Sequence, residues 1–176
     1  MSAAGGSLDD SLDGDIAALS AALLDLCQAK GLRIATAESC TGGGVAAALT
    51  DIAGSSAVFE RGFVTYSNEA KAELLSVPQD VLARHGAVSE EVARAMVAGT
   101  LARAPAELAV AVTGVAGPGG GTAQKPVGLV WFAAARRGAE PISTERRFNP
   151  ELGRSGIRTA SVAEALKLLM ELARTG

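Results

Sequence analysis

Residues 32–50 read LRIATAESCTGGGVAAALT and combine three local signals. The β-branched and aliphatic run from Leu32 to Thr36 predicts a buried strand, and the run from Val45 to Thr50 predicts a helix. Hydroxyls, a thiol and three glycines lie between them, at a strand-to-helix turn. Such a turn places side chains at the carboxyl edge of a sheet, beside the free N–H groups of a helix start. A nucleophile and an anion-stabilising pocket can be built together at such a place.

Helical and extended segments alternate along the rest of the chain. Apolar spacing, capping residues and glycine or proline breaks set their limits. This order predicts a three-layer α/β/α fold with a mixed, largely parallel central sheet. Helices are expected at 16–29, 41–51, 68–75, 90–104 and 152–173, and strands at 32–36, 57–65, 107–112, 127–135 and 141–148.

The composition is that of one globular domain with an aliphatic core. The chain has 176 residues, which is long enough for a substantial core. These residues are 48% hydrophobic but only 3% aromatic. We expect a single domain at 14–176, after a disordered lead-in at 1–13 that is rich in Gly, Ser, Ala and Asp. No apolar run approaches the roughly 20 residues needed to cross a bilayer, and the N-terminus lacks signal-peptide features. We therefore expect no membrane partner and a cytoplasmic protein.

Charge and rare residues exclude several function classes. The net charge of −3 argues against nucleic acid as a partner, because nucleic-acid binding needs a basic face. Two cysteines cannot form a disulfide framework, and Cys27 reads as a core residue. The single histidine, His85, excludes a zinc site of two or three histidines. Its place at the end of a short predicted helix favours a capping role over membership of a catalytic triad.

The turn at residues 37–44 offers two candidate nucleophiles. Ser39 is the first, with the N–H groups of Thr41, Gly42 and Gly43 as donors to an oxyanion or a phosphate. Cys40 is the alternative, since a helix start lowers a thiol pKa. The non-catalytic interpretation is a helix start with Thr41 as its cap and glycines for packing.

A serine nucleophile without histidine needs another base. The string Tyr66-Ser67-Asn68-Glu69-Ala70-Lys71 supplies a lysine one turn into a short helix. Desolvation can lower a lysine pKa far enough for it to act as a base. Taken alone, the same string also fits Asn68 as a helix cap and Lys71 as a solvated side chain.

Two further segments are candidates for substrate binding. A glycine-rich loop at 113–126 follows a predicted central strand, so Thr113, Gly114 and Gly117 lie at the edge where open α/β sheets bind ligands. The loop matches neither a Walker loop nor a dinucleotide fingerprint, and Lys125 stands near its end. Arg154 and Arg158, at the start of the last helix, can clamp a phosphate or can be solvated.

Taken together and in order, these motifs resemble the CinA C-terminal domain family, which includes stand-alone nicotinamide-nucleotide amidohydrolases. The resemblance runs from about Leu32 to the final helix. The matching strings are Ala37-Glu38-Ser39-Cys40-Thr41-Gly42-Gly43, Gly54-Ser55-Ser56, Gly62-Phe63-Val64-Thr65-Tyr66-Ser67-Asn68, Lys71, His85-Gly86-Ala87-Val88-Ser89, Thr113-Gly114-Val115-Ala116-Gly117-Pro118, Lys125-Pro126-Val127-Gly128, and Arg154 with Arg158.

The resemblance implies hydrolysis of the carboxamide of nicotinamide mononucleotide to nicotinate mononucleotide and ammonia, in pyridine nucleotide recycling. It implies Ser39 as nucleophile, Lys71 as its partner, Tyr66 as a further catalytic residue lining the site, and Thr113 lining the site for substrate binding. It implies no metal or organic cofactor, and a homodimer. Two departures from the family pattern stand out: the segment before Arg154 is longer and lacks an aspartate, and Gly44 replaces a larger residue. The alternatives are a non-catalytic nucleotide-binding module, a scaffold for protein partners and a competence or damage-inducible accessory protein.

Overall fold

The computed structural model describes residues 8–175, with side chains described from Asp15 onward. Residues 1–7 of the predicted lead-in lie outside this range, and the first helix begins at Leu8, ahead of the core-facing pattern that starts at Ile16. The elements are α1 (Leu8–Lys30), β1 (Ile34–Glu38), α2 (Gly44–Thr50), a 3₁₀ turn (Ser55–Ala57), β2 (Phe59–Val64), α3 (Asn68–Leu75), α4 (Gln79–His85), α5 (Glu90–Arg103), β3 (Leu108–Gly114), β4 (Leu129–Arg136), β5 (Ile142–Arg147), a second 3₁₀ turn (Pro150–Leu152) and α6 (Gly153–Arg174).

The described strands form one sheet in the order β2-β1-β3-β4-β5. Strand β1 pairs in parallel with both β2 and β3, whereas β4 is antiparallel to β3 and to β5. Within residues 8–175, all strands except β4 therefore point the same way, and the predicted mixed, largely parallel sheet is confirmed. The carboxyl ends of β1, β2 and β3 meet at one edge, so the segments that follow them are neighbours.

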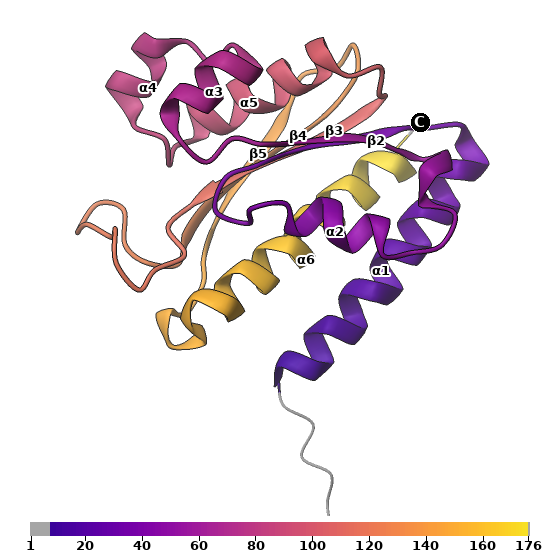
Figure 1. Ribbon diagram of the computed structural model, residues 1–176, viewed down its shortest axis with the longest axis horizontal. Coiled ribbons are helices and arrows are strands. Elements are labelled where there is room, and N and C mark those ends of the chain that lie inside the picture. Colours follow the sequence, from indigo (N-terminus) through magenta and orange to yellow (C-terminus); the bar gives the residue numbers. More distant parts are fainter. Residues whose placement is uncertain (1–7, 176) are drawn as a thin grey trace, which may run out of the picture.

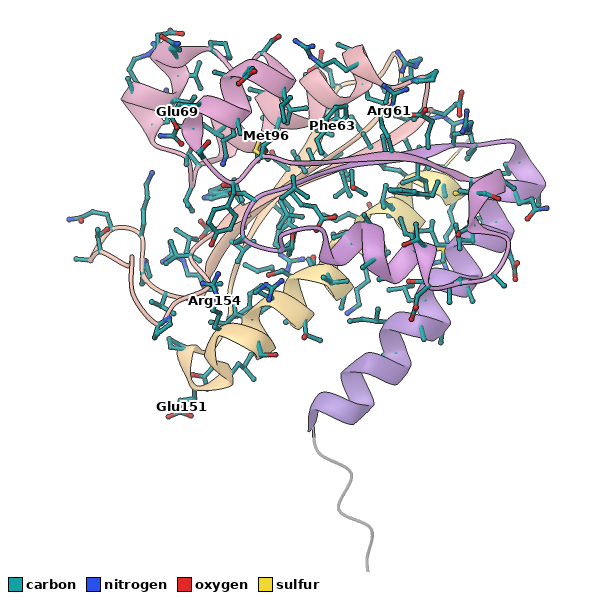
Figure 2. The ribbon with its side chains drawn as sticks, viewed as in Figure 1. Arg61, Phe63, Glu69, Met96, Glu151 and Arg154 are labelled. Atoms are coloured by element: carbon teal, nitrogen blue, oxygen red, sulfur yellow. The ribbon has the colours of Figure 1, made fainter. Side chains whose placement is uncertain are left out.

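Helices cover both faces of the sheet, as the predicted three-layer architecture requires (Figure 1). Helices α1, α2 and α6 pack on one face, over a core that includes Ile34 and Phe132. Helices α3, α4 and α5 form the other layer, whose core holds Met96 with Phe63 against it (Figure 2). No described helix is long and apolar enough to cross a membrane.

The pleat of β1 decides which layer each of its side chains faces. Successive side chains of a strand point to opposite faces, and Ile34 belongs to the α1/α2/α6 core while Ala37 belongs to the α3/α5 core. Two residues beyond Ala37, Ser39 faces the α3 layer. Glu38 faces α2.

A close approach of α3 to α5 sets the position of the helix that carries Lys71. Gly99, in the middle of α5, has no room for a side chain, because a Cβ there would meet the main-chain carbonyl of Leu75 at the end of α3. Glycine costs about 1 kcal/mol in a helix interior relative to alanine. A glycine is nevertheless required here, because any larger residue would collide with the main chain of α3.

Candidate active site

Ser39 follows β1 directly and extends its ladder. Its N–H donates to the carbonyl of Val112 at 2.9 Å, so its main chain is held against β3. The side chain is 8% exposed. Ser39 is therefore fixed at the carboxyl edge of the sheet, in the position that the sequence predicts for the nucleophile.

Lys71 is fully buried and reaches Ser39 from α3. Helix α3 is capped by the Ser67 hydroxyl, which accepts a hydrogen bond from the Ala70 N–H at 3.0 Å. The Lys71 Nζ lies 3.0 Å from Ser39 Oγ and donates to the carbonyl of Thr65 at 2.7 Å. Asn68, considered above as a possible cap, is instead the first residue of the helix. The solvated interpretation of Lys71 does not hold, because the side chain has no exposed surface.

Burial gives the Lys71 amine the properties of a base. Loss of solvent around the charged form lowers the pKa of Lys71 from 10.5 to about 8, as expected for a desolvated ammonium. A neutral amine can accept the proton of a hydroxyl at hydrogen-bond distance. The pair therefore has both the geometry and the acidity that an activated serine requires.

Cys40 is poorly placed to act as the nucleophile. Its side chain belongs to the α1/α2/α6 core, whereas Ser39 faces the layer that carries Lys71 and is hydrogen-bonded to it. Burial, with a smaller effect from the Glu38 carboxylate, raises the pKa of the Cys40 thiol to about 11. A thiol attacks as its thiolate, so the geometry and the pKa both favour Ser39.

The turn after Ser39 uses most of its own N–H groups. Gly42 donates to the carbonyl of Ser39 at 3.0 Å, and Gly43 donates to the Glu38 carboxylate at 3.1 Å. Among the described residues the Thr41 N–H has no acceptor, so it is the predicted oxyanion donor that stays available. The Thr41 hydroxyl is buried without a partner and caps no helix, which is a correction to the expectation of a Thr41 cap.

Arg154, at the start of α6 (Figure 2), is hydrogen-bonded to two other segments of the chain. It donates from Nη1 to the carbonyl of Gly117 at 2.8 Å and from Nη2 to the Tyr66 hydroxyl at 3.0 Å. Tyr66 is 61% exposed. Arg158, one turn further along α6, donates to the carbonyl of Thr41 at 3.0 Å. The unusual segment before Arg154 therefore does not keep its side chain away from the other predicted residues.

The remaining predicted residues have structural contacts of their own. The Thr113 hydroxyl is buried and donates to the carbonyl of Ala87 at 2.8 Å. At Gly114, a Cβ would come within 2.9 Å of the Val130 Cα, so this glycine allows β3 to pack on β4. Lys125 donates from Nζ to the carbonyl of His85. These contacts tie the glycine-rich loop to the end of α4.

Among the described residues, His85 forms no hydrogen bond or ion pair with Ser39. It ends α4, as predicted, and its Nδ1 lies 3.2 Å from a Glu91 carboxylate oxygen. No group of three or more His, Cys, Asp or Glu side chains in the described part of the chain is arranged to hold a metal ion.

Sequence reasoning missed two groups at this site. The first is the Thr65 carbonyl, which accepts from Lys71 and cannot be recognised from residue type. The second is Glu38, whose buried carboxylate accepts N–H groups at the start of α2. An acid at the end of a strand, followed by a helix without an acidic first turn, is the signal that could have identified it.

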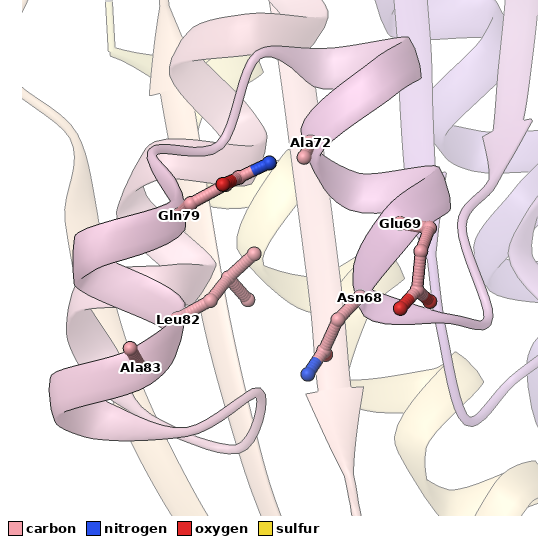
Figure 3. A pocket seen from close by; sticks show the side chains of 6 residues that line it. All are labelled: Asn68, Glu69, Ala72, Gln79, Leu82 and Ala83. Carbon is pink, nitrogen blue, oxygen red and sulfur yellow. The ribbon is translucent and has the colours of Figure 1, made fainter.

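Two cavities lie next to the site. One, of about 360 Å³, separates α3 from α4 and is lined by Asn68, Glu69, Ala72, Gln79, Leu82 and Ala83 (Figure 3). The other, of about 240 Å³, lies among α1, α2 and α6 and includes Thr41, Ser155 and Arg158. Neither is lined by Ser39 or Lys71.

The chain matches a known protein family over most of its length. The model of the CinA C-terminal domain matches residues 16–173. The chain belongs to the CinA C-terminal domain family. The resemblance inferred from the motifs is thereby confirmed.

Other members of the family occur both alone and within longer proteins. The nicotinamide-nucleotide amidohydrolase PncC of Escherichia coli strain K12 is 49% identical over 159 residues, which are 90% of this chain and 95% of that protein. A CinA-like protein of Akkermansia muciniphila is 53% identical over 143 residues, which are 81% of this chain but 34% of that protein. The solved structure of the competence/damage inducible protein CihA from Agrobacterium tumefaciens is 47% identical, has a TM-score of 0.89, and covers 99% of this chain and 100% of its own.

Proposed function

We propose that this protein hydrolyses the carboxamide of nicotinamide mononucleotide, with Ser39 as nucleophile and Lys71 as general base. The observation that carries the proposal is the 3.0 Å separation of Ser39 Oγ from a buried Lys71 Nζ with a pKa of about 8. The substrate class rests on the similarity to PncC, which covers nearly the whole of both chains. Recycling of pyridine nucleotides is the pathway that this reaction would serve.

The reaction proceeds through an acyl-enzyme. Ser39 Oγ attacks the carboxamide carbon while its proton moves to Lys71 Nζ, which gives a tetrahedral intermediate. We assign stabilisation of its oxyanion to the Thr41 N–H, which has no acceptor among the described residues. Lys71 then returns the proton to the leaving nitrogen, the C–N bond breaks and ammonia departs. Water next loses a proton to Lys71 and attacks the ester. Collapse releases the carboxylic acid, and Ser39 recovers its proton.

Two arginines give an acidic protein a local positive charge for an anionic substrate. Arg154 and Arg158 project from the first two turns of α6. Arg158 contacts the carbonyl of Thr41, in the turn that follows Ser39, and Arg154 contacts Tyr66 and Gly117. Guanidinium groups bind phosphate through paired, charge-assisted hydrogen bonds. We assign them to the nucleotide phosphate, with Tyr66 and Gly117 beside it.

The catalytic rate should depend on the protonation of Lys71. Its folded-state pKa is lowered to about 8, and only the neutral amine can act as a base, so kcat/KM should rise with pH and level off above this value. Below it, the rate should fall about tenfold for each unit of pH. Initial rates of ammonia release between pH 5.5 and 9.5 measure this. A profile that is flat from pH 6 to 9 would contradict the role of Lys71 as base.

The substrate class is tested by ammonia release from free nicotinamide, its riboside, its mononucleotide and its dinucleotide. We expect kcat/KM for the mononucleotide to exceed that for the riboside by at least about tenfold, because the riboside lacks the charge that the arginines would bind. Release of ammonia from none of the four would overturn the proposal. Tight calorimetric binding of the mononucleotide without ammonia would indicate a nucleotide-binding module instead.

The homodimer and the cytoplasmic location expected from the sequence stay predictions. Light scattering on the purified protein would establish its oligomeric state.

A further inference from the structure

The carboxylate of Glu38 is fully buried at the last position of β1. None of the ion pairs among the described residues involves it. Instead it accepts three main-chain hydrogen bonds. Oε2 receives the N–H groups of Gly43 and Val45 at 3.1 and 3.0 Å, and Oε1 receives that of Ala46 at 2.9 Å. A buried carboxylate is costly unless it is hydrogen-bonded or paired, and here both oxygens of Glu38 accept hydrogen bonds.

These three donors belong to the start of α2, where the remaining N–H, that of Gly44, donates to the carbonyl of Thr41 at 3.1 Å. The first N–H groups of a helix have no acceptor within the helix, and a Ser, Thr, Asp or Asn cap normally provides one. Helix α2 has Gly43 at its cap position, in the left-handed region at φ 98°, with no side-chain cap bond and no acid in its first turn. Glu38 therefore caps α2 from the preceding strand.

The turn that carries the nucleophile is held between these two attachments. The main chain of Glu38 is paired with both β2 and β3, while its side chain grips α2. Residues 39–42 link the strand to the helix, and the Gly42 N–H closes the turn on the Ser39 carbonyl. The Glu38 and Ser39 side chains face opposite layers, so Glu38 does not contact the reacting atoms.

We propose that Glu38 is a positioning residue that sets the distance from Ser39 Oγ to Lys71 Nζ and aims the Thr41 N–H at the oxyanion. The inference rests on the proposed Ser39–Lys71 chemistry. By taking the Gly43, Val45 and Ala46 N–H groups, Glu38 also withholds the start of α2 from the substrate. Of the three predicted oxyanion donors, Thr41, Gly42 and Gly43, the Thr41 N–H is then the one without an acceptor among the described residues.

The role requires a carboxylate and not merely a side chain of this shape. A carboxylate only accepts hydrogen bonds, whereas the carboxamide of glutamine carries two N–H donors on one of its terminal atoms. In Glu38→Gln, the amide oxygen can replace Oε2, but the NH₂ group would then face the Ala46 N–H. The variant keeps the volume of the site, loses one attachment and gains a donor–donor repulsion, which should shift the turn.

The experiment compares Glu38→Gln with the wild type and with Glu107→Gln. Glu107 is a matched control because its carboxylate also accepts a main-chain N–H, from Arg33 at 2.7 Å, at the opposite end of β1. We expect Glu38→Gln to lower kcat for nicotinamide mononucleotide by about a hundredfold, the scale of loss from a misplacement of about 1 Å. KM should change less than about threefold, because the residue acts in the transition state and not in substrate binding. Glu107→Gln should keep the wild-type kcat.

Two further measurements separate positioning from loss of structure. A Ser39→Ala background prevents turnover, so binding of the mononucleotide can be measured by calorimetry. In this background, the affinity should be the same with and without the Glu38→Gln substitution, because Glu38 does not act in substrate binding. A crystal structure of Glu38→Gln should show Ser39 Oγ and Lys71 Nζ beyond hydrogen-bond distance, with the sheet unchanged. The crystal structure needs no substrate, so it tests the role of Glu38 independently of activity. Absence of ammonia release by the wild type would instead count against the proposed function. An unchanged kcat, or an unchanged Ser39–Lys71 distance in the Glu38→Gln crystal, would overturn the inference.

Discussion

Replacing Ser39 with alanine is expected to reduce ammonia release from nicotinamide mononucleotide by at least about a thousandfold, because no acyl-enzyme can form. The fold should survive, since the Ser39 side chain is a small group whose loss leaves the main-chain bond to Val112 intact. Calorimetric binding of the mononucleotide should also survive, because attack on the carboxamide follows binding. Steady-state ammonia release and circular dichroism together measure the effect.

The matched comparison is Cys40→Ala. The Cys40 thiol is turned into the α1/α2/α6 core and has a pKa of about 11, so we expect this variant to retain activity within about threefold of the wild type. The reverse pattern, an active Ser39→Ala protein and an inactive Cys40→Ala protein, would transfer the nucleophile to Cys40. Trapped acyl-enzyme located by mass spectrometry would identify the residue directly.

Replacing Lys71 with methionine should abolish activity to a similar extent without destabilising the protein. The methionine keeps the length of the side chain and removes the amine that we propose as the acceptor of the Ser39 proton. Burial that lowers the pKa of Lys71 from 10.5 to about 8 corresponds to a folding penalty of about 3 kcal/mol for the charged form at neutral pH. The methionine removes this penalty, and the loss of the hydrogen bonds to Ser39 and Thr65 offsets part of the stability gained. The free energy of unfolding at pH 7 should therefore be no lower than that of the wild type.

The stability difference between these two proteins should depend on pH in a defined window. Between about pH 8 and pH 10.5 the unfolded wild type binds a proton at Lys71 that the folded protein does not, so wild-type stability rises with pH there. The cost of burying the charged Lys71 amine in the wild type is complete below about pH 8 and absent above about pH 10.5. The advantage of Lys71→Met should therefore shrink across this window, as urea unfolding at several pH values would show.

Lys167→Met serves as the control, because Lys167 is exposed on α6. It should alter neither ammonia release nor the pH dependence of stability. A Lys71→Met protein that still deamidates the substrate at the wild-type rate would remove lysine from the mechanism. A lower stability of Lys71→Met at every pH would show instead that its hydrogen bonds outweigh the cost of burying the amine.

Local chemistry in the sequence was enough to place most elements and the central pair. The helix expected at 68–75 is α3, although its cap is Ser67 and not Asn68. The strand expected at 32–36 lies two residues later, at Ile34–Glu38, because the pairing of β1 with β2 and β3 continues to Glu38. The start of α2 was expected at Thr41 or Gly42 but lies at Gly44. That boundary depends on the Glu38 carboxylate, a partner from outside the helix.

The roles of the predicted glycines and of Arg154 are decided by the tertiary structure. Gly42 and Gly43 were expected to present N–H groups to a ligand, but both groups are used inside the turn. Arg154 comes from a segment that departs from the family pattern, yet its guanidinium contacts Tyr66 and Gly117. Residue type and spacing do not report which main-chain donors are already paired.

The order of strands and helices, the serine at the end of β1 and the lysine one turn into α3 follow from the sequence, because propensity, capping and periodicity act over short distances along the chain. The 3.0 Å approach of Ser39 to Lys71, the burial that lowers the lysine pKa and the capping of α2 by Glu38 arise only in the folded molecule. Each depends on groups brought together by the packing of α3 and α2 against opposite faces of the sheet. Desolvation and hydrogen-bond geometry are properties of that packing, and no stretch of residues carries them alone.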